Sequence, residues 1–482
     1  MTQWWLTRWR RGAKRARTLR TPLRLEWLEE RNLLTSGLVV VPNPTVAGQS
    51  FNLVGTAAVA ANDIWSVGSN VFIDPTTGAI DTQPLAEHFN GQSWSVVSTP
   101  LVASGGPISP TAKFYSVAAA ASNDVWAVGF RFGPDNPDNG ESLIENWNGS
   151  SWSVVPSPTA MVESTSLNAV AAISPSNVWA VGSNAGNVLV EHFDGTNWKV
   201  VNSPVFGSGQ ATAISADSAN DIWVVNGGTF LHFDGTKWSS VASAIGIASG
   251  STAVTALSPT DVWATGAEVG RTGGRHPRTF PIAAIEHWDG TSWSIVTSPN
   301  PNPGGASTLQ GIAAISANDI WAVGAFGGTS AVPSEFTLTE HWDGTSWSII
   351  PSPSPAANQN QLFAVTALSD GTVAAVGHQE GTNGDQPLIL QNAASAPQTA
   401  STNAPLAASA ATVGSTSGAS LTLGSAIDDQ TRTLPAPSDT AAVDQFFSTV
   451  GEVDQQLWLL SYNLGTRHTA ANGDLNGLPG GM

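Results

Sequence analysis

Glutamate–histidine pairs recur along the chain and are the first residues that could do acid–base chemistry. The pairs stand at 87–88, 191–192, 286–287 and 340–341, and Glu145–Asn146 and His232 occupy the same place in two related segments. A carboxylate beside an imidazole is a pairing that general acid–base catalysis uses. Each pair belongs to a different copy of a repeated segment, so the copies cannot converge on one substrate. We therefore interpret them as strand side chains that form hydrogen bonds within their own repeat.

The segment that carries these pairs is one of two phrases that alternate through the chain. The first phrase reads EHWDGTSWS at 286–294 and has related copies at 87–95, 145–153, 191–199, 231–239 and 340–348. The second reads NDVWAVG at 123–129, with copies at 62–68, 176–182, 220–226, 260–266 and 318–324 and a diverged seventh at 370–377. The tryptophans of the second phrase recur at intervals of 40 to 61 residues. A period of this size is typical of propellers and solenoids.

Each repeat resolves into four short strands, as in 167–204. The Asx and glycine residues between the strands suit tight hairpins, because they tolerate positive φ or form side-chain turn bonds. Four antiparallel strands per repeat form the blade of a β-propeller. Small side chains in the first strand fit a crowded axis, and tryptophans would fill the wedge between blades. The predicted structural tryptophans are Trp65, Trp126, Trp179, Trp223, Trp263 and Trp321 in the second strands and Trp94, Trp152, Trp198, Trp238, Trp293 and Trp347 in the fourth strands.

Counting the repeats gives seven blades, the last of which lacks a fourth strand. LVVVPNP at 38–44 matches WSVVPSP at 152–158, with Leu38 in place of the tryptophan. We therefore predict that 37–45 forms the outer strand of the last blade and closes the ring, which removes two sheet edges. The predicted fold is an all-β, seven-bladed β-propeller over residues 37–392.

Composition limits the classes of chemistry open to the chain. Its 482 residues include no cysteine, which removes disulfides and thiolate chemistry. Residues 1–36 hold nine of the 18 basic and three of the 36 acidic side chains, which leaves nine basic and 33 acidic residues, or a net charge of −24, for the rest. The propeller should therefore repel nucleic acid. No apolar run is long enough to span a membrane, and no motif indicates a cofactor or a bound metal.

The alternating NDVWAVG and HWDGTSW phrases resemble those of bacterial secreted or surface proteins that fold as seven-bladed propellers. The DGTSW turn at 343–347 also resembles the Asp-box of sialidase-type propellers, although Asp343 and Gly344 are adjacent here. The resemblance implies an architecture and not an activity, because propellers host unrelated functions. A sialidase needs arginines from separate blades and a tyrosine, whereas the predicted propeller has one tyrosine, Tyr115, and three of its four arginines lie in one loop.

The two ends of the chain lie outside the predicted propeller. RLEWLEERNLL at 24–34 resembles the Leu-Glu-Pro-Arg-x-Leu-Leu signature of large secreted or envelope proteins in some bacteria, which implies that residues 1–36 are a targeting segment. The alternative is a basic arm that binds nucleic acid. After the propeller, a low-complexity linker at 393–437 precedes 438–482, where an amphipathic helix is predicted from the spacing of Val443, Phe447 and Val450.

The connections between second and third strands differ from blade to blade and are long at 69–84, 130–142 and 267–281. Variable loops on a rigid scaffold are where binding usually resides. The stretch 267–281 carries Arg271, Arg275, His276 and Arg278, which could hold a carboxylate or sulfate of a polysaccharide. A solvated loop without a ligand is the alternative.

The sequence therefore favours a non-enzymatic, monomeric β-propeller, extracellular or in the cell envelope, that binds a polysaccharide or a protein through its variable loops. Two alternatives stay open. One is a glycan-active propeller enzyme, a sialidase-like hydrolase or a lyase; glycoside hydrolysis would need two carboxyl groups about 5–10 Å apart on the variable face. The other is an intracellular scaffold, if residues 1–36 are not a targeting signal.

Overall fold

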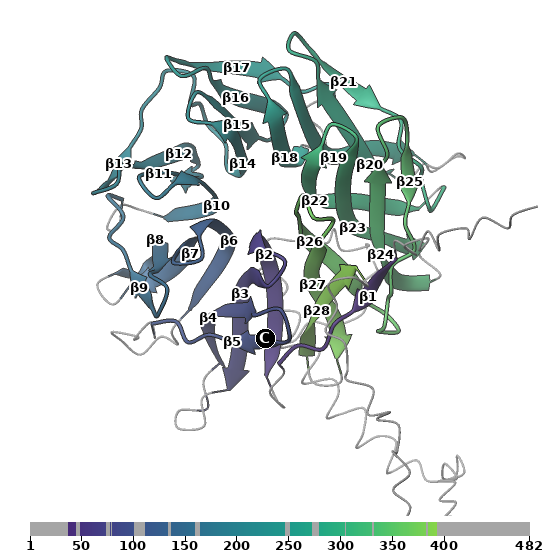
Figure 1. Cartoon of the computed structure of the whole chain (residues 1–482), viewed down its shortest axis with the longest axis horizontal. Coiled ribbons are helices and arrows are strands. Elements are labelled where there is room, and N and C mark those ends of the chain that lie inside the picture. Colours follow the sequence, from purple (N-terminus) through teal and green to yellow (C-terminus); the bar gives the residue numbers. More distant parts are fainter. Residues whose placement is uncertain are drawn as a thin grey trace, which may run out of the picture. The chain divides into compact units, whose positions relative to one another are not determined.

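The computed structural model describes residues 37–44, 49–73, 78, 80–100, 111–133, 136–159, 164–245, 251–271, 279–303, 305–329, 332–381 and 384–392. The predicted targeting segment, the linker and the C-terminal helix lie outside these residues. Every element in the described residues is a β-strand, and the strands form seven four-stranded antiparallel sheets around one axis (Figure 1). This part of the chain contains no helix long and apolar enough to cross a lipid bilayer.

The strands of each blade are given from the axis outward. Blade 1 comprises β2 (Ser50–Ala60), β3 (Asp63–Ile73), β4 (Ile80–Phe89) and β5 (Trp94–Val96). Blade 2 comprises β6 (Ala112–Ala121), β7 (Asp124–Gly133), β8 (Asn136–Trp147) and β9 (Trp152–Val154). Blade 3 comprises β10 (Thr165–Ser174), β11 (Asn177–Asn184), β12 (Asn187–Phe193) and β13 (Trp198–Val200). Blade 4 comprises β14 (Ala211–Ser218), β15 (Asp221–Asn226), β16 (Thr229–Phe233) and β17 (Trp238–Ala242).

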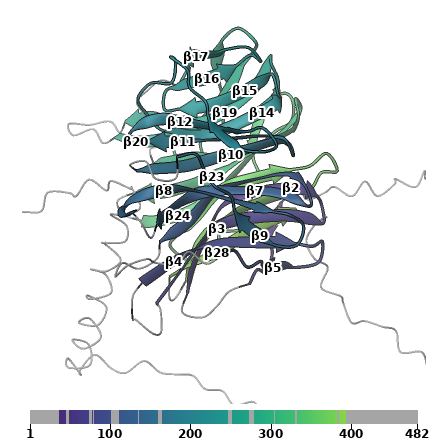
Figure 2. The same ribbon diagram turned by 90° about the vertical axis from the view of Figure 1, so that its left-hand side faces the viewer.

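The remaining blades complete the ring. Blade 5 comprises β18 (Ser251–Ser258), β19 (Asp261–Arg271), β20 (Thr279–Trp288) and β21 (Trp293–Val296). Blade 6 comprises β22 (Ala306–Ser316), β23 (Asp319–Thr329), β24 (Val332–Trp342) and β25 (Trp347–Ile349). Blade 7 comprises β26 (Asn360–Ala367), β27 (Val373–Gly381), β28 (Gly384–Asn392) and the N-terminal β1 (Leu38–Val40). Each inner strand contacts the inner strands of both neighbouring blades, and these strands run roughly along the axis of the ring (Figure 2).

The N-terminal strand closes the ring, as the sequence predicts. β1 pairs antiparallel with β28, in a register that places Leu38 opposite Asn392 and Val40 opposite Leu390. The Val41 amide extends this pairing by donating to the Ile389 carbonyl at 2.9 Å. Blade 7 therefore joins the two ends of the propeller by backbone hydrogen bonds and leaves no open junction in the ring.

Tryptophans join neighbouring blades. At five junctions the second-strand tryptophan of one blade meets the fourth-strand tryptophan of the next, with ring planes inclined by 66° to 88°. These pairs, with centroid distances, are Trp65–Trp152 (5.4 Å), Trp126–Trp198 (5.5 Å), Trp179–Trp238 (5.9 Å), Trp223–Trp293 (5.6 Å) and Trp263–Trp347 (5.9 Å). At the junction of blades 6 and 7 Leu38 packs in one cluster with Trp321, and at the junction of blades 7 and 1 Ala374 packs in one cluster with Trp94. Edge-to-face contacts of this kind stabilise a core beyond their buried area.

Part of what the sequence predicts as long loops is strand. In blade 1 the pairing of β3 with β4 continues to Ile73 opposite Ile80, within the predicted loop 69–84. In blade 5 it continues to Arg271 opposite Thr279. Two antiparallel strands continue to pair for as long as their backbone N–H and C=O groups can form hydrogen bonds. Residues that are common in loops, such as Gly, Asp and Asn, do not prevent this pairing. Blades 1, 2, 5, 6 and 7 thus carry extended hairpins, whereas blade 3 turns directly after Asn184 and blade 4 directly after Asn226.

Candidate functional site

Every inner strand contains a β-bulge at the same place. The register to the second strand shifts between Leu53 and Gly55 in blade 1, and at the matching position in the other six blades. The glycine of the repeated NDVWAVG phrase faces this bulge. A Cβ on Gly68 would lie 1.8 Å from the Asn52 carbonyl oxygen, and similar clashes occur at the matching glycines of blades 2, 3, 6 and 7. Glycine is needed there because the bulge brings a backbone carbonyl against the second strand.

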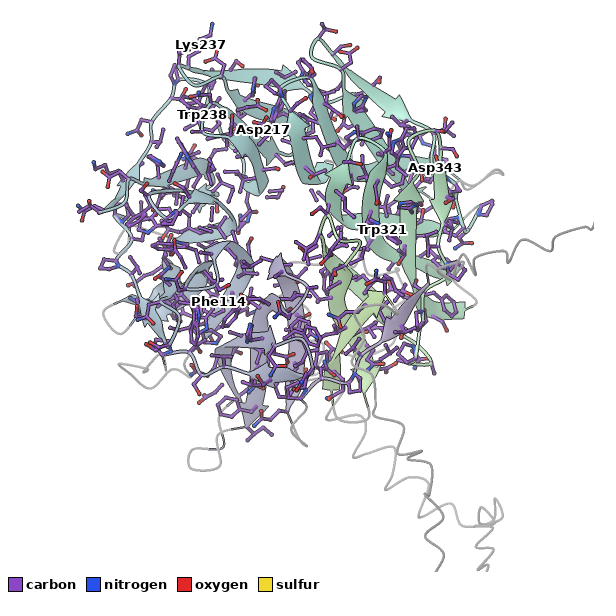
Figure 3. The ribbon with its side chains drawn as sticks, viewed as in Figure 1. Phe114, Asp217, Lys237, Trp238, Trp321 and Asp343 are labelled. Carbon is purple, nitrogen blue, oxygen red and sulfur yellow. The ribbon has the colours of Figure 1, made fainter. Side chains whose placement is uncertain are left out.

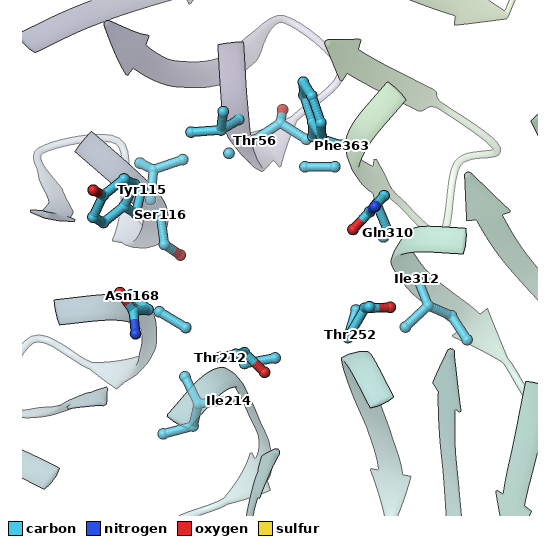
Figure 4. Close-up of a pocket in the computed structure, with 18 of the residues that line it drawn as sticks. Thr56, Tyr115, Ser116, Asn168, Thr212, Ile214, Thr252, Gln310, Ile312 and Phe363 are labelled. Carbon is cyan, nitrogen blue, oxygen red and sulfur yellow. The ribbon is translucent and has the colours of Figure 1, made fainter. Parts of the chain in front are cut away.

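The bulged residues surround a channel on the axis of the ring (Figure 4). We call them the mouth ring: Val54, Tyr115, Asn168, Thr212, Thr252, Gln310 and Phe363. The next residue along each inner strand is Gly, Ser or Ala, and the one after that is Thr, Val or Ile, so two further rings line the channel. The channel has a volume of about 240 Å³. All of its described lining residues are uncharged.

The mouth ring opens toward the variable face. Its residues lie in the first half of the inner strands, near the connections from the preceding blade and the hairpins between second and third strands. No two neighbouring blades place the same side chain in it except blades 4 and 5, which both use threonine. The other inner-strand positions in the channel repeat small or β-branched residues. The positions that vary between blades therefore include all seven residues of the mouth ring, which surround the axis.

Several mouth-ring side chains are held in place by their neighbours. Asn168 Nδ2 donates to the Ala211 carbonyl at 2.8 Å, and the Thr252 hydroxyl donates to the Leu309 carbonyl at 2.6 Å, each across to the next blade. The Tyr115 ring lies parallel to Phe130, with centroids 6.4 Å apart. Burial raises the pKa of the Tyr115 phenol, so this group is neutral over the physiological range.

The mouth-ring residues are uncharged, whereas the residues that the sequence predicts to bind a ligand are basic. Arg271 is exposed at the end of β19 and does not line the channel. Arg275, His276 and Arg278 lie outside the described residues. Whether these four residues bind a ligand therefore stays a prediction. The sequence patterns did not predict the mouth ring. Its position is nevertheless visible in the sequence, because the residue directly before the repeated small residue differs from blade to blade, as Tyr115 does before Ser116.

The histidines of the repeated pairs lie inside the blades. Nε2 of each histidine donates to Oδ1 of the Asx residue of the second strand, and each imidazole ring packs on the tryptophan two residues after that Asx. The Nε2–Oδ1 distances are His88–Asp63 2.8 Å, His192–Asn177 2.8 Å, His232–Asp221 2.6 Å, His287–Asp261 2.9 Å and His341–Asp319 2.8 Å. In blade 4 Asp221 also accepts the Trp223 indole N–H at 3.0 Å. The side chains therefore fix hairpins in five separate blades.

The glutamates of the pairs are fully buried between blades. Some receive hydrogen bonds from the segment that follows the preceding blade's outer strand: Ser157 and Thr159 donate to Glu191 at 2.9 and 2.7 Å. Ser243 and the Ala244 amide do the same for Glu286, at 2.9 and 2.7 Å. These hydrogen bonds to the carboxylates join consecutive blades in addition to the tryptophan pairs.

Two of the glutamates lack such partners. Both carboxyl oxygens of Glu87 and of Glu145 are buried, without a hydrogen bond to any described residue. Burial raises the pKa of Glu87 to about 8, and it raises the pKa of Glu145 to about 8 against the opposing effect of Arg131. Both groups are therefore mostly neutral acids at pH 7, because ionisation in an apolar surrounding is costly. Glu87 lies in blade 1 and Glu145 in blade 2.

The turn between third and fourth strands is braced by its Asx residue. Asp289 Oδ1 accepts the amides of Thr291 and Ser292 at 2.8 and 2.9 Å, and the bond from the Thr291 hydroxyl together with these amides lowers the pKa of Asp289 to about 2. The glycine after it has φ of +92°. Figure 3 shows the equivalent Asp343 at the outer edge of the ring, away from the channel. Among the described residues no group of three or more His, Asp or Glu is placed to hold a metal ion.

Comparison with known proteins identifies no family for this chain. No family model matches the chain, and no curated protein matches it. Among solved structures it is similar to "YCF48 bound to D1 peptide", with 14% identity, a TM-score of 0.45 and coverage of 73% of this chain and 97% of that chain. It is also similar to YCF48 from Cyanidioschyzon merolae (16% identity, TM-score 0.46, 74% and 98% coverage) and to U3-55K (9%, 0.44, 74% and 98%). Identities of 16% or less with TM-scores below 0.5 say nothing of function, which depends on the site itself.

Proposed function

We propose that the chain is an exported, non-enzymatic β-propeller that binds a polysaccharide or a protein at the cell envelope through its variable face. The observation that carries the proposal is the mouth ring, in which one repeated backbone feature presents unlike side chains around a single axis. Recognition residues belong on positions that the scaffold does not constrain, and this circle consists of such positions. The repeated histidines, the Asx residues of the second strands and the tryptophans form hydrogen bonds and ring contacts with one another inside the blades, as His232, Asp221 and Trp223 do.

The extended hairpins supply the rim of this face. Arg271 ends one of them, and the segment that follows it contains Arg275, His276 and Arg278. On a body with excess negative charge, these side chains would offer charge-assisted hydrogen bonds to a carboxylate or sulfate. The rim would thus serve acidic ligands, and the mouth ring would serve uncharged ones.

The binding part of the proposal is tested with the full chain and a panel of neutral and acidic envelope polysaccharides and envelope proteins. Bound fraction and release of new reducing ends are measured in the same samples. Binding without new ends is expected. New reducing ends would show a glycan-active enzyme instead, and failure of every probe to bind would overturn the binding role.

The export part of the proposal rests on the resemblance of residues 24–34 to a bacterial secretion and envelope signature. Residues 1–36 fused to a folded reporter protein should carry it out of the cytoplasm of a bacterial host that uses this signature. A matched fusion with Leu33 and Leu34 replaced by Ser should stay inside. A reporter that remains cytoplasmic with the unaltered segment would favour an intracellular scaffold.

A further inference from the structure

The mouth ring is divided into two chemically different arcs. Blades 7, 1 and 2 contribute Phe363, Val54 and Tyr115, which form an aromatic and aliphatic arc. Blades 3 to 6 contribute Asn168, Thr212, Thr252 and Gln310, which form an amide and hydroxyl arc. Figure 4 shows the two arcs facing each other across the channel, with Phe363 and Tyr115 on one side and Thr212 and Thr252 on the other. A ligand seated there meets an apolar surface on one side and hydrogen-bonding groups on the other.

The apolar arc is held rigid from behind. The Tyr115 ring lies parallel to Phe130, and the Phe363 ring packs on the His378 imidazole, with centroids 5.3 Å apart. On the polar arc, Asn168 and Thr252 are tied to the next blade, so their remaining acceptor sites point from fixed positions. Thr212 and Gln310 are exposed and free to adjust to a ligand. A mostly preorganised site of this kind loses little side-chain freedom on binding.

Size and charge narrow the class of ligand. A volume of about 240 Å³ is below the roughly 300–1,000 Å³ of sites for drug-sized molecules. The channel therefore accepts one small ring or side chain, and no helix or strand. Because all described lining residues are uncharged, a carboxylate, sulfate or ammonium group would lose its hydration there without gaining a counter-charge.

We propose that the mouth ring binds one neutral sugar ring of a polysaccharide, an inference that rests on the binding function proposed above. The C–H face of the sugar would pack on Phe363 and Tyr115, and its hydroxyls would meet the amide and hydroxyl arc. A pyranose carries hydroxyls around its edge and an apolar face, which matches both arcs at once. An apolar peptide side chain would leave the polar arc desolvated and unpaired, and a charged peptide terminus would lack a counter-charge.

The test uses the full chain and defined oligosaccharides followed by calorimetry. The neutral probes are cellohexaose, maltohexaose and mannohexaose, and the acidic probe is hexagalacturonic acid. Thr212→Trp would fill the mouth from an exposed position. Gln310→Ala removes one exposed amide of the polar arc. The matched control is Gln92→Ala, which removes an equally exposed amide from a turn between third and fourth strands, at the opposite end of the blade from the mouth.

At least one neutral oligosaccharide should bind the unaltered chain. Thr212→Trp should weaken that binding at least tenfold, and Gln310→Ala should weaken it by roughly two- to tenfold, the usual effect of one lost neutral hydrogen bond. Gln92→Ala should change nothing. Unchanged thermal unfolding of each variant excludes loss of fold as the cause.

Three results would overturn the inference, and they differ in what they leave standing. If a neutral oligosaccharide binds the Thr212→Trp variant as tightly as the unaltered chain, the mouth ring is not the sugar-binding site, but the proposed binding function stands. If only hexagalacturonic acid binds, and Arg271→Ala weakens that binding while Thr212→Trp does not, the rim is the binding site. If no probe of any class binds the unaltered chain, both the inference and the binding function fall.

Discussion

Each inner strand of blades 1 to 6 bulges twice, and the two bulges are filled in opposite ways. The first bulge carries the unlike residues of the mouth ring. The second, near the turn to the second strand, carries aliphatic residues in five of the six blades: Val59, Ala120, Ile173, Leu257 and Ile315. The exception is Asp217 in blade 4.

Packing explains the difference between the two bulges. Ile173, Leu257 and Ile315 pack against hydrophobic clusters between blades, so an aliphatic side chain is needed there. The mouth-ring side chains border the channel and belong to none of the hydrophobic clusters between blades, so their chemistry can differ from blade to blade. Asp217 is exposed, and its pKa is raised by desolvation and by the nearby Asp221. The side chain at the β-bulge is therefore constrained by packing at one end of the inner strand, whereas at the other end it can vary with function.

The largest expected effect contrasts the buried core with the mouth ring, by substitution of one residue of each in blade 4. Trp223 is fully buried, stacks on His232 and meets Trp293 of the next blade. Trp223→Ala should lower the free energy of unfolding by about 3–5 kcal/mol, because the cavity would remain open between blades. Urea unfolding followed by tryptophan fluorescence and circular dichroism measures it.

Thr212→Val, in the mouth ring of the same blade, is the matched comparison. It should change the free energy of unfolding by no more than about 0.5 kcal/mol, since the side chain is exposed and near-isosteric with valine. If Thr212→Val destabilises the chain as much as Trp223→Ala does, the mouth ring is part of the constrained core and the contrast is wrong.

A second test sharpens the comparison within the constrained core by setting Glu87 against Glu191. The pKa of Glu87 is about 8 in the folded chain because of burial, against an ordinary value of 4.5. Its protonated form is favoured by folding, so its contribution to stability is complete below about pH 4.5 and is lost as the pH rises toward and through 8. With 1.36 kcal/mol for each pH unit of difference, the free energy of unfolding should fall by a few kcal/mol across this window.

Glu87→Gln should remove this decline and make the chain more stable than the unaltered protein at pH 9. Burial raises the pKa of Glu191 as well, but the hydrogen bonds from Thr159 and Ser157 oppose that rise, so Glu191→Gln should give a smaller gain. The difference between each variant and the unaltered chain, measured by urea unfolding from pH 5 to 9, isolates each glutamate from the histidines. Equal pH profiles for Glu87→Gln and the unaltered chain would contradict the raised pKa.

Much of the fold can be predicted from sequence because each blade repeats a local pattern. The strand order, the number of blades and the closing strand at Leu38 all follow from matching one repeat to the next. The contacts between tryptophans are predictable in kind, since a large side chain at a fixed place in six of the seven blades must fill the space between blades. The lengths of the hairpins are not predictable in this way, because strand pairing beyond Ser69 or Phe130 depends on backbone bonds and not on composition.

The candidate site is harder to predict because it depends on register. The place of Tyr115 in the channel follows from a bulge between β6 and β7, which no residue of β6 specifies by itself. The repeated glycine opposite the bulge is the nearest sequence signal, and its meaning emerges only when the paired carbonyl is known. In the same way, Glu87 and Glu191 occupy one repeat position, and only the neighbouring blade's segment decides which of them gains hydroxyl partners.

A third test concerns the repeated turns, where the loss of stability should lie between that of the buried core and that of the mouth ring. In blade 2 Asn148 Oδ1 accepts the amides of Ser150 and Ser151, both at 3.0 Å. Asn148→Ala removes these bonds from an exposed turn and should cost about 1 kcal/mol. Asn148→Asp should be nearly neutral, because Asp289 and Asp343 accept the same amides in their own blades. If both variants lose equal stability in urea unfolding, the turn depends on the asparagine amide group and not on the shared acceptor oxygen.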